Sequence, residues 1–484
     1  MNKELRRISI ASLAMFVALF VSTSVIQVFE VDELRADPRN VRTLYESYSA
    51  ERGPILLNGT PIAQSVAVDT PFAFLRQYPE PAVYAPVTGY FTLNQGNTGV
   101  EGAYNDFLTG TANEQFLDQL GALVTGQRPR GAAVQLTIDP VVQQAAYDAL
   151  GNLKGAIVAI EPSTGRILAM VSTPSFDPNR LAAHDTESVL AAYDELLADP
   201  NDPLVNRTIS GDLYFPGSTF KVLVAAAAFD SGRFTPEDAF PNPARLALPL
   251  STDTITNSNG GTCGSEATVT IATALRLSCN VPFAELGVAL GEDTLAEYTE
   301  AFGFGTTFEV PMEATPSSFP TGLDDAQLML SSFGQYDVRV TPLQVALISA
   351  AIANGGNLMQ PTLLDRIIAP DLSIVEQPEA TLSSQPISRI TAETMTQLMV
   401  DGVANGAASN ARIEGVAVAG KTGTAENGDD APYTLWFTGF APADNPQVAI
   451  AVVVEDGGGR GQSGSGNQIA APIAKRVLEA VLSR

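Results

Sequence analysis

An uncharged, apolar run near the N-terminus is the feature that most constrains this chain. Residues 8–29 contain no charged side chain and are about as long as an α-helix must be to cross a bilayer. Lys3, Arg6 and Arg7 precede the run, while Glu30, Asp32 and Glu33 follow it. Because positive charge stays on the cytoplasmic side, the pattern predicts a cytoplasmic tail at residues 1–7, a single transmembrane anchor at 8–29 and an extracytoplasmic remainder.

A cleaved signal peptide is the alternative interpretation of the same run. The run is longer than the usual apolar region of a signal peptide, and it ends at residues 26–29 without a clear pair of small residues for cleavage. We therefore favour an uncleaved anchor in the cell membrane. With either interpretation, most of the chain is exported.

Composition narrows the class of protein further. The 484 residues suffice for two or three domains, and the apolar content of 45% is typical of folded proteins. The formal net charge is -26, which argues against a nucleic-acid partner because such a partner requires a basic surface.

The pattern of turn residues and apolar runs changes near residue 135. Residues 30–134 carry many Gly, Pro and Asn turn signals between short apolar runs, which predicts an irregular, strand-rich module. A second domain is expected at 135–484, with strands at 156–160, 167–171, 416–419, 435–440 and 448–454 and helices at 141–150, 222–229 and 469–482. Strands at both ends with helices between them indicate an α+β domain, in which helices pack on an antiparallel sheet. Residues 457–466 are expected to form a flexible, Gly-rich loop.

The surroundings of the single histidine, His184, argue against a Ser-His-Asp triad. It lies among Asp185 and Glu187 in a segment that is typical of a solvated loop, and no Gly-x-Ser-x-Gly elbow opens a helix. The favoured interpretation of His184 is an ordinary surface histidine.

A serine activated by a lysine is the alternative, and three short motifs support it. Ser218 and Lys221 are three residues apart at the start of the expected helix 222–229, so they share one helix face. Backbone N–H groups at a helix N-terminus also stabilise a developing oxyanion. The second motif is Ser-Cys-Asn at residues 278–280, and the third is Lys-Thr-Gly-Thr at 421–424, at the end of an expected strand.

The three motifs in this order resemble the signature of penicillin-binding proteins. Other segments that resemble this family are residues 51–63, 99–104, 155–170 and 334–344. The chain is similar to class B penicillin-binding proteins, closest to the actinobacterial penicillin-binding protein A type. Residues 30–134 are too few for the glycosyltransferase domain of class A members. The implied fold is α+β: a transpeptidase (serine β-lactamase-like) domain with a five-stranded antiparallel sheet, on a short pedestal resembling a dimerisation domain.

The chemistry and the resemblance together suggest catalytic roles for five side chains. Ser218 would attack the penultimate D-alanine of a peptidoglycan stem peptide, and Lys221, kept neutral by burial and by Lys421, would take its proton. Ser278 would pass a proton to the leaving amine and would be held by Lys421. Asn280 would bind a substrate amide. No metal or cofactor is required for this chemistry.

The resemblance also implies how the substrate would be bound. Thr422 and Thr424 would bind the terminal carboxylate, and Gly423 between them would let the substrate approach the backbone. The backbone N–H groups of Ser218 and Thr424 would form the oxyanion hole. The aromatic residues Trp436 and Phe437 are interpreted as buried sheet residues.

Two cysteines complete the set of candidate residues. In an exported protein Cys263 and Cys279 are expected to pair, and the alternative is two buried thiols that never meet. A disulfide would constrain the second motif, because Cys279 is its middle residue.

The function predicted from these motifs is a peptidoglycan D,D-transpeptidase that β-lactam antibiotics inhibit covalently. The alternatives are a D,D-carboxypeptidase, a β-lactamase and a non-catalytic β-lactam sensor or scaffold. The β-lactamase is disfavoured because no Glu-x-x-Leu-Asn pattern is evident between residues 280 and 421. The resemblance implies a polytopic membrane glycosyltransferase as a partner, since class B members do not polymerise glycan.

Overall fold

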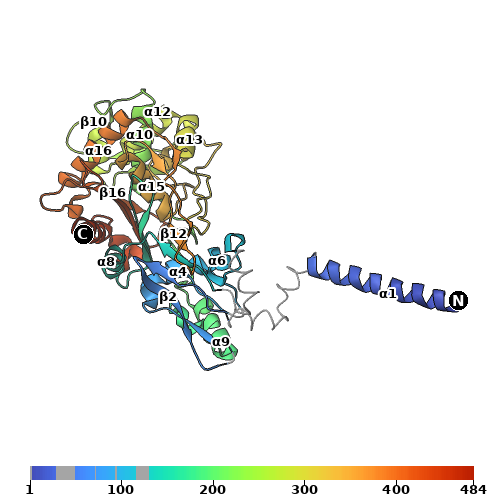
Figure 1. Cartoon of the computed structure of the whole chain (residues 1–484). Coiled ribbons are helices and arrows are strands. Elements are labelled where there is room, and N and C mark those ends of the chain that lie inside the picture. Colours follow the sequence, from blue (N-terminus) through green and yellow to red (C-terminus); the bar gives the residue numbers. More distant parts are fainter. Residues whose placement is uncertain (1–2, 29–49, 71, 93–94, 116–129) are drawn as a thin grey trace.

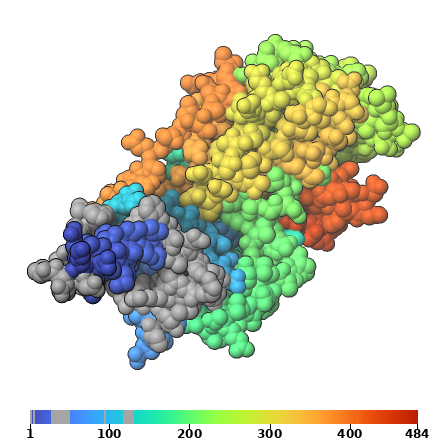
Figure 2. All heavy atoms as spheres, turned by 90° about the vertical axis from the view of Figure 1, so that its right-hand side faces the viewer, coloured from blue at the N-terminus to red at the C-terminus, as the bar shows by residue number. Residues whose placement is uncertain are grey.

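A computed structural model describes residues 3–28, 50–70, 72–92, 95–115 and 130–484. The N-terminal helix α1 spans Lys3–Val28, and its segment Arg6–Ile26 has a mean hydropathy of 2.1. This helix is long and apolar enough to cross a membrane. The folded body is elongated, with α12 and α13 at one end and β2 and α9 at the other (Figures 1 and 2).

A five-stranded antiparallel sheet forms the centre of the larger part, as expected. Its strands, in the order in which they pair, are β15 (Ala419–Ala425), β16 (Thr434–Ala441), β17 (Val448–Val454), β5 (Gly155–Ile160) and β6 (Ile167–Thr173). Side chains alternate between the two faces, so that Ile157 and Ala159 belong to one core while Ala156 and Val158 belong to the other. Because both faces are buried, β5, β17 and most of β6 are continuous apolar runs in the sequence.

Helices cover the two faces of the central sheet. α8 (Pro140–Leu150) and α17 (Ala470–Leu482) pack together on one face, and α15 (Pro342–Ala353) packs on the other (Figure 1). Asp139 caps α8, because its side chain accepts hydrogen bonds from two backbone N–H groups of the first turn and Pro140 follows it. α9 (Thr186–Ala198) lies at the pedestal end of the molecule (Figure 1). The remaining helices of the larger part are α10 (Lys221–Asp230), α11 (Ile271–Leu277), α12 (Val281–Leu290), α13 (Glu292–Ala301), α14 (Asp325–Ser331) and α16 (Arg389–Ala404).

Short elements complete the larger part. The strand pairs are β7 (Ala239–Pro241) with β10 (Thr268–Thr270), β8 (Arg245–Ala247) with β9 (Thr254–Thr256), and β11 (Leu358–Met359) with β14 (Leu382–Ser384). The 3₁₀ turns are η2 (Pro178–Arg180), η3 (Gly217–Thr219), η4 (Ser409–Ala411), η5 (Asp456–Gly459) and η6 (Gly461–Ser463).

The smaller part, which we call the pedestal, is built on a second sheet. Its strand order is β13 (Ile374–Glu376), β12 (Leu364–Ile368), β4 (Ala133–Leu136), β1 (Ile55–Leu57), β2 (Thr60–Ala67) and β3 (Phe74–Gln77). Three helices, α4 (Pro81–Thr88), α5 (Gly99–Ala103) and α6 (Asn105–Thr109), and the turn η1 (Asn113–Gln115) accompany it. The expectation of a strand-rich module missed these helices and the two strands, β12 and β13, that come from much later in the sequence.

Two expectations about the second half of the chain were wrong in detail. The strand expected at 416–419 is β15, which begins at Ala419 and contains the whole Lys-Thr-Gly-Thr motif instead of ending before it. Pairing with β16 outweighs the low strand propensity of its glycines. The segment expected to be a flexible loop at 457–466 contains η5 and η6, and the Gly466 N–H donates to Thr424 Oγ1 at 3.3 Å.

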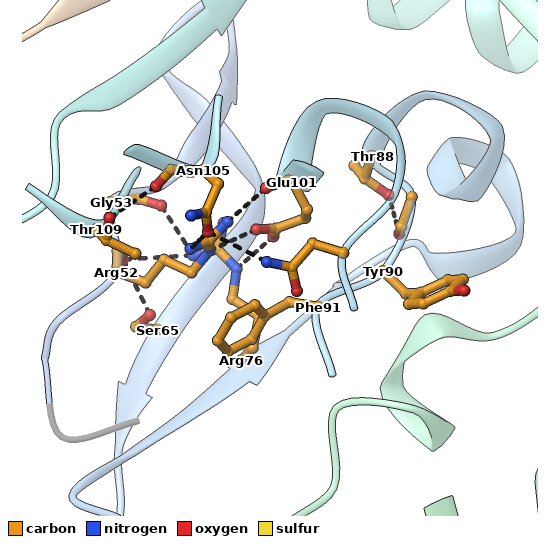
Figure 3. A network of polar contacts seen from close by, with 12 residues as sticks. Arg52, Gly53, Ser65, Arg76, Thr88, Tyr90, Phe91, Glu101, Asn105 and Thr109 are labelled. Carbon is orange, nitrogen blue, oxygen red and sulfur yellow. Dashed lines mark hydrogen bonds and ion pairs between the residues drawn. The ribbon is translucent and has the colours of Figure 1, made fainter. Parts of the chain in front are cut away.

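A buried ion network joins the strands and helices of the pedestal (Figure 3). Arg52 Nε and Arg76 Nε each donate to one carboxylate oxygen of Glu101 at 2.6 Å, and Tyr78 also donates to it. The Arg52 guanidinium lies 4.4 Å from the ring centroid of Phe91. Burial alone would raise the pKa of Glu101, but the charges of the two arginines outweigh it and lower the pKa.

Candidate active site

The proposed nucleophile, Ser218, lies in η3, one turn before the α-helix proper begins at Lys221. The expectation that Ser218 opens an α-helix is therefore corrected to a 3₁₀ turn. This turn needs Gly217, whose φ of 52° is in the left-handed region and whose N–H donates to the Gly334 carbonyl at 2.9 Å. Among the described residues, Ser218 Oγ has no hydrogen-bond partner, and the residue is 9% exposed.

Lys221 is fully buried beneath this turn and faces the second motif. Its Nζ donates to the Ser278 carbonyl at 3.0 Å and to Asn280 Oδ1 at 2.7 Å. Burial, and then the charge of Lys421, lower the pKa of Lys221 well below its usual value. A neutral amine has two N–H donors and one lone pair, so the two hydrogen bonds leave the lone pair free to accept a proton.

The second motif has a constrained backbone. Ser278 ends α11 with a φ of 64°, a left-handed conformation that is uncommon for residues other than glycine. The next residue, Cys279, is buried and forms a disulfide with Cys263. Asn280 is held by its neighbours, because its N–H donates to Asn257 Oδ1 at 2.8 Å and its amide donates to the Thr256 carbonyl at 2.9 Å.

The third motif lies on β15, the edge strand of the central sheet. Lys421 Nζ donates to Ser278 Oγ at 2.6 Å and to the Thr422 carbonyl at 2.8 Å, and burial lowers its pKa to about 7. A Cβ on Gly423 would lie 3.0 Å from the Pro216 carbonyl oxygen, so the close approach of β15 to η3 favours glycine here.

The two threonines of the third motif differ in their surroundings. Thr424 lines the cleft beside Ser218, whereas the Thr422 hydroxyl donates to the Ala407 carbonyl at 3.1 Å. The cleft has a volume of about 220 Å³ and is lined by Gly217, Ser218, Thr254, Ile255, Thr256, Asn280, Leu330, Phe333, Gln335, Tyr336, Thr424 and Glu426. Three motifs that are far apart in the sequence thus meet in one cleft.

Comparison with known proteins agrees with this geometry. Residues 155–479 match the penicillin-binding protein transpeptidase domain, and residues 52–134 match the penicillin-binding protein A dimerisation domain. The chain belongs to the penicillin-binding protein transpeptidases.

Several relatives of this family are similar over the full length of the chain. The peptidoglycan D,D-transpeptidase PbpA of Mycolicibacterium smegmatis is 44% identical, covering 100% of this chain and 99% of that protein. The protein of the same name from Mycobacterium tuberculosis is also 44% identical over the same shares of both chains. Among solved structures, penicillin-binding protein A from M. tuberculosis as a penicillin G acyl-enzyme complex is 42% identical, with a TM-score of 0.84, and covers 90% of this chain and 100% of its own.

Sequence reasoning missed several residues of this transpeptidase cleft. Asn257 holds the backbone of Asn280, and Thr254 and Thr256 belong to the hairpin strand β9 beside it. Gln335 and Glu426 also line the cleft. Gln335 lies in a segment that resembles the family, which was a usable signal, but nothing local distinguishes Asn257 or Glu426 from other polar loop residues.

Residues that were expected to lie outside the chemistry do so. The Trp436 and Phe437 side chains are fully buried in β16, where Trp436 Nε1 donates to the Phe215 carbonyl at 3.0 Å. His184 is half-buried against the pedestal, where its Nε2 is 3.0 Å from the Phe74 carbonyl oxygen. It does not line the cleft.

Replacing Lys421 with methionine is expected to move the acidic limb of the pH–rate profile of acylation to higher pH. Below about pH 7 Lys421 is protonated, and its charge helps to keep Lys221 neutral. Without that charge the pKa of Lys221 rises, so a higher pH is needed to free its lone pair. The rate of acylation by benzylpenicillin, followed between about pH 5 and 9, measures the shift.

The control for this experiment is Lys475→Met, which removes a partly exposed lysine on α17. It should leave the profile unchanged, because Lys475 is remote from the cleft residues. An acidic limb at the wild-type pH in the Lys421→Met protein would show that Lys421 does not set the protonation of Lys221.

Proposed function

We propose that this chain is a membrane-anchored peptidoglycan D,D-transpeptidase, which cross-links stem peptides through an acyl-enzyme on Ser218 and is inhibited covalently by β-lactams. The observation that carries the proposal is the polar assembly beside Ser218. A buried lysine with a lowered pKa, Lys221, lies one helical turn away, and Lys421 and Ser278 are joined by a hydrogen bond of 2.6 Å. The named relatives and their acyl-enzyme complexes support the same chemistry.

In the acylation step, the Ser218 hydroxyl proton moves to the Lys221 Nζ lone pair as Oγ attacks the carbonyl of the penultimate D-alanine. The backbone N–H groups of Ser218 and Thr424 would stabilise the oxyanion that forms. The C–N bond then breaks, and the terminal D-alanine leaves after its amine gains a proton through Ser278. Asn280 would hold the donor amide.

The terminal carboxylate of the donor would be bound by Thr424 and by the charge on Lys421. Thr424 lines the cleft, whereas the hydroxyl of Thr422 already donates to a backbone carbonyl. We therefore assign the carboxylate to Thr424 first and give Thr422 a supporting role. Gly423 would let the substrate lie close to the β15 backbone.

The arrangement of domains is consistent with an active site that lies at a distance from the bilayer. We propose that residues 8–29 anchor the chain, that 30–134 together with β12 and β13 form the pedestal, and that the rest of 135–484 forms the transpeptidase domain on the outer side of the cell membrane. The apolar helix α1 supports the anchor. A polytopic membrane glycosyltransferase is the proposed partner, because the domain matches include no domain that polymerises glycan.

To test this function, the purified full-length chain in detergent is incubated with a pentapeptide donor and an acceptor stem peptide that carries a free amine. Release of D-alanine together with a new amide-linked dimer, both detected by mass spectrometry, is the expected result. Release of D-alanine without a dimer would indicate a D,D-carboxypeptidase instead. No release at all would contradict both functions and favour a non-catalytic β-lactam sensor.

A further inference from the structure

Glu426, at the end of β15, is the one charged residue among those that line the catalytic cleft. All of these lining residues belong to the described part of the chain. Glu426 is exposed, and its carboxylate takes part in no ion pair with another described residue. The charge of Glu426 contributes, after burial, to raising the pKa of Tyr433, so the carboxylate lies near the start of β16.

The backbone of Glu426 is fixed relative to the nucleophile. With its amide oriented to satisfy both groups, the Gln335 side chain donates to the Glu426 carbonyl at 3.1 Å and accepts from the Glu426 N–H at 3.3 Å. The preceding residue, Gly334, accepts a hydrogen bond from the N–H of Gly217, beside Ser218. The turn that carries the nucleophile and the end of β15 are thus held together through residues 334–335.

A larger cavity, of about 530 Å³, adjoins the chain segment that follows Glu426. Asn427 and Phe215, each close in sequence to a cleft residue, line it. Polar side chains in its wall are held by hydrogen bonds, because Glu455 accepts from Tyr214 at 2.7 Å and from Arg207 at 3.0 Å. The volume of this cavity suits a short peptide segment, and Asn427 places the cavity beside Glu426 in the chain.

The second substrate of a transpeptidase is an amine, which is mostly protonated in water near neutral pH. Lys421 is protonated below about pH 7, and in that state it repels an ammonium group that approaches the cleft. A carboxylate at the cleft entrance offsets this repulsion and raises the local concentration of the amine. We propose that Glu426 binds the ammonium group of the acceptor stem peptide, whose remainder occupies the cavity lined by Phe215 and Asn427.

This role of Glu426 rests on the proposed transpeptidase function, in which an acceptor amine takes the acyl group from Ser218. The bound ammonium releases one proton to water, and the resulting amine attacks the acyl carbonyl. The new C–N bond forms, the bond from that carbonyl to Ser218 Oγ breaks, and the remaining excess proton of the attacking nitrogen passes to Oγ. Glu426 stays ionised throughout and acts only by positioning the acceptor.

The experiment measures how the acyl-enzyme divides between aminolysis and hydrolysis. The full-length chain is given a D-alanyl thioester donor and either N-acetyl-lysine amide, whose side chain is an ammonium, or hydroxylamine, which is neutral. Glu426→Gln should raise the half-saturating concentration of the lysine amide about five-fold, as expected for a partly screened ion pair. The partition with hydroxylamine should change less than two-fold, and Glu426→Asp should restore part of the selectivity.

Asp430→Asn is the matched control, because it removes one carboxylate from the same exposed loop without lining either cavity. It should behave as the wild type with both nucleophiles. Equal losses with the lysine amide and hydroxylamine in Glu426→Gln, or no loss with either, would overturn the role of Glu426 while leaving the transpeptidase function intact. If the wild type forms no acyl-enzyme with the donor, the proposed function itself fails.

Discussion

Replacement of Lys221 by methionine should slow acylation by benzylpenicillin about a thousand-fold, in the range that loss of a general base produces. Lys221 is fully buried, its pKa is lowered by burial and by Lys421, and its two hydrogen bonds leave one lone pair free. Methionine fills a similar volume but has no basic nitrogen. The second-order rate constant, obtained from intact mass against time, measures the effect.

Two further variants make the result specific to proton transfer. Lys221→Arg should be as slow as Lys221→Met, because a guanidinium remains charged and has no lone pair to offer. Lys475→Met, on the surface of α17, should acylate at the wild-type rate. Acylation of Lys221→Met within ten-fold of the wild type would contradict the role of this lysine as the base.

Replacement of Glu101 by glutamine should destabilise the pedestal by about 4 kcal/mol, as expected when one partner of a buried ion pair is removed. The carboxylate receives hydrogen bonds from Arg52 and Arg76, and the side chains of all three residues are almost fully buried. A neutral amide leaves two guanidinium groups uncompensated. It also presents an N–H donor where only donors face it.

Urea unfolding of the full-length protein measures this loss, with Glu114→Gln as the control. Glu114 is an exposed residue of the same domain, so its neutralisation should shift the unfolding midpoint little. Benzylpenicillin acylation at low temperature should be retained in Glu101→Gln, because the network does not touch the catalytic cleft. A midpoint equal to that of the wild type would show that the network is energetically neutral.

The elements that could be predicted from the sequence are those whose signals are local. β5 and β17 of the central sheet are apolar runs, α8 has a cap and a proline at its start, and each of the three motifs is a short string. Local signals failed where tertiary contacts decide the structure. β15 contains glycines that weaken a strand by themselves, and its pairing with β16 fixes it.

The rest of the site depends on contacts between residues distant in sequence. Asn257 supports Asn280 from 23 residues away, and the Thr422 hydroxyl is turned towards Ala407. No periodicity or motif records such contacts. The same reason explains why β12, more than 200 residues after β4, was not expected in the pedestal sheet.

The central claim is that Ser218 carries the acyl group, and intact mass spectrometry with benzylpenicillin tests it most directly. The full-length protein and its Ser218→Ala variant are incubated with the antibiotic, and their masses are followed over time. We predict a stable adduct, equal to one molecule of benzylpenicillin, in the wild type and none in Ser218→Ala. An adduct of the same mass in Ser218→Ala, or no adduct in the wild type, would contradict the claim.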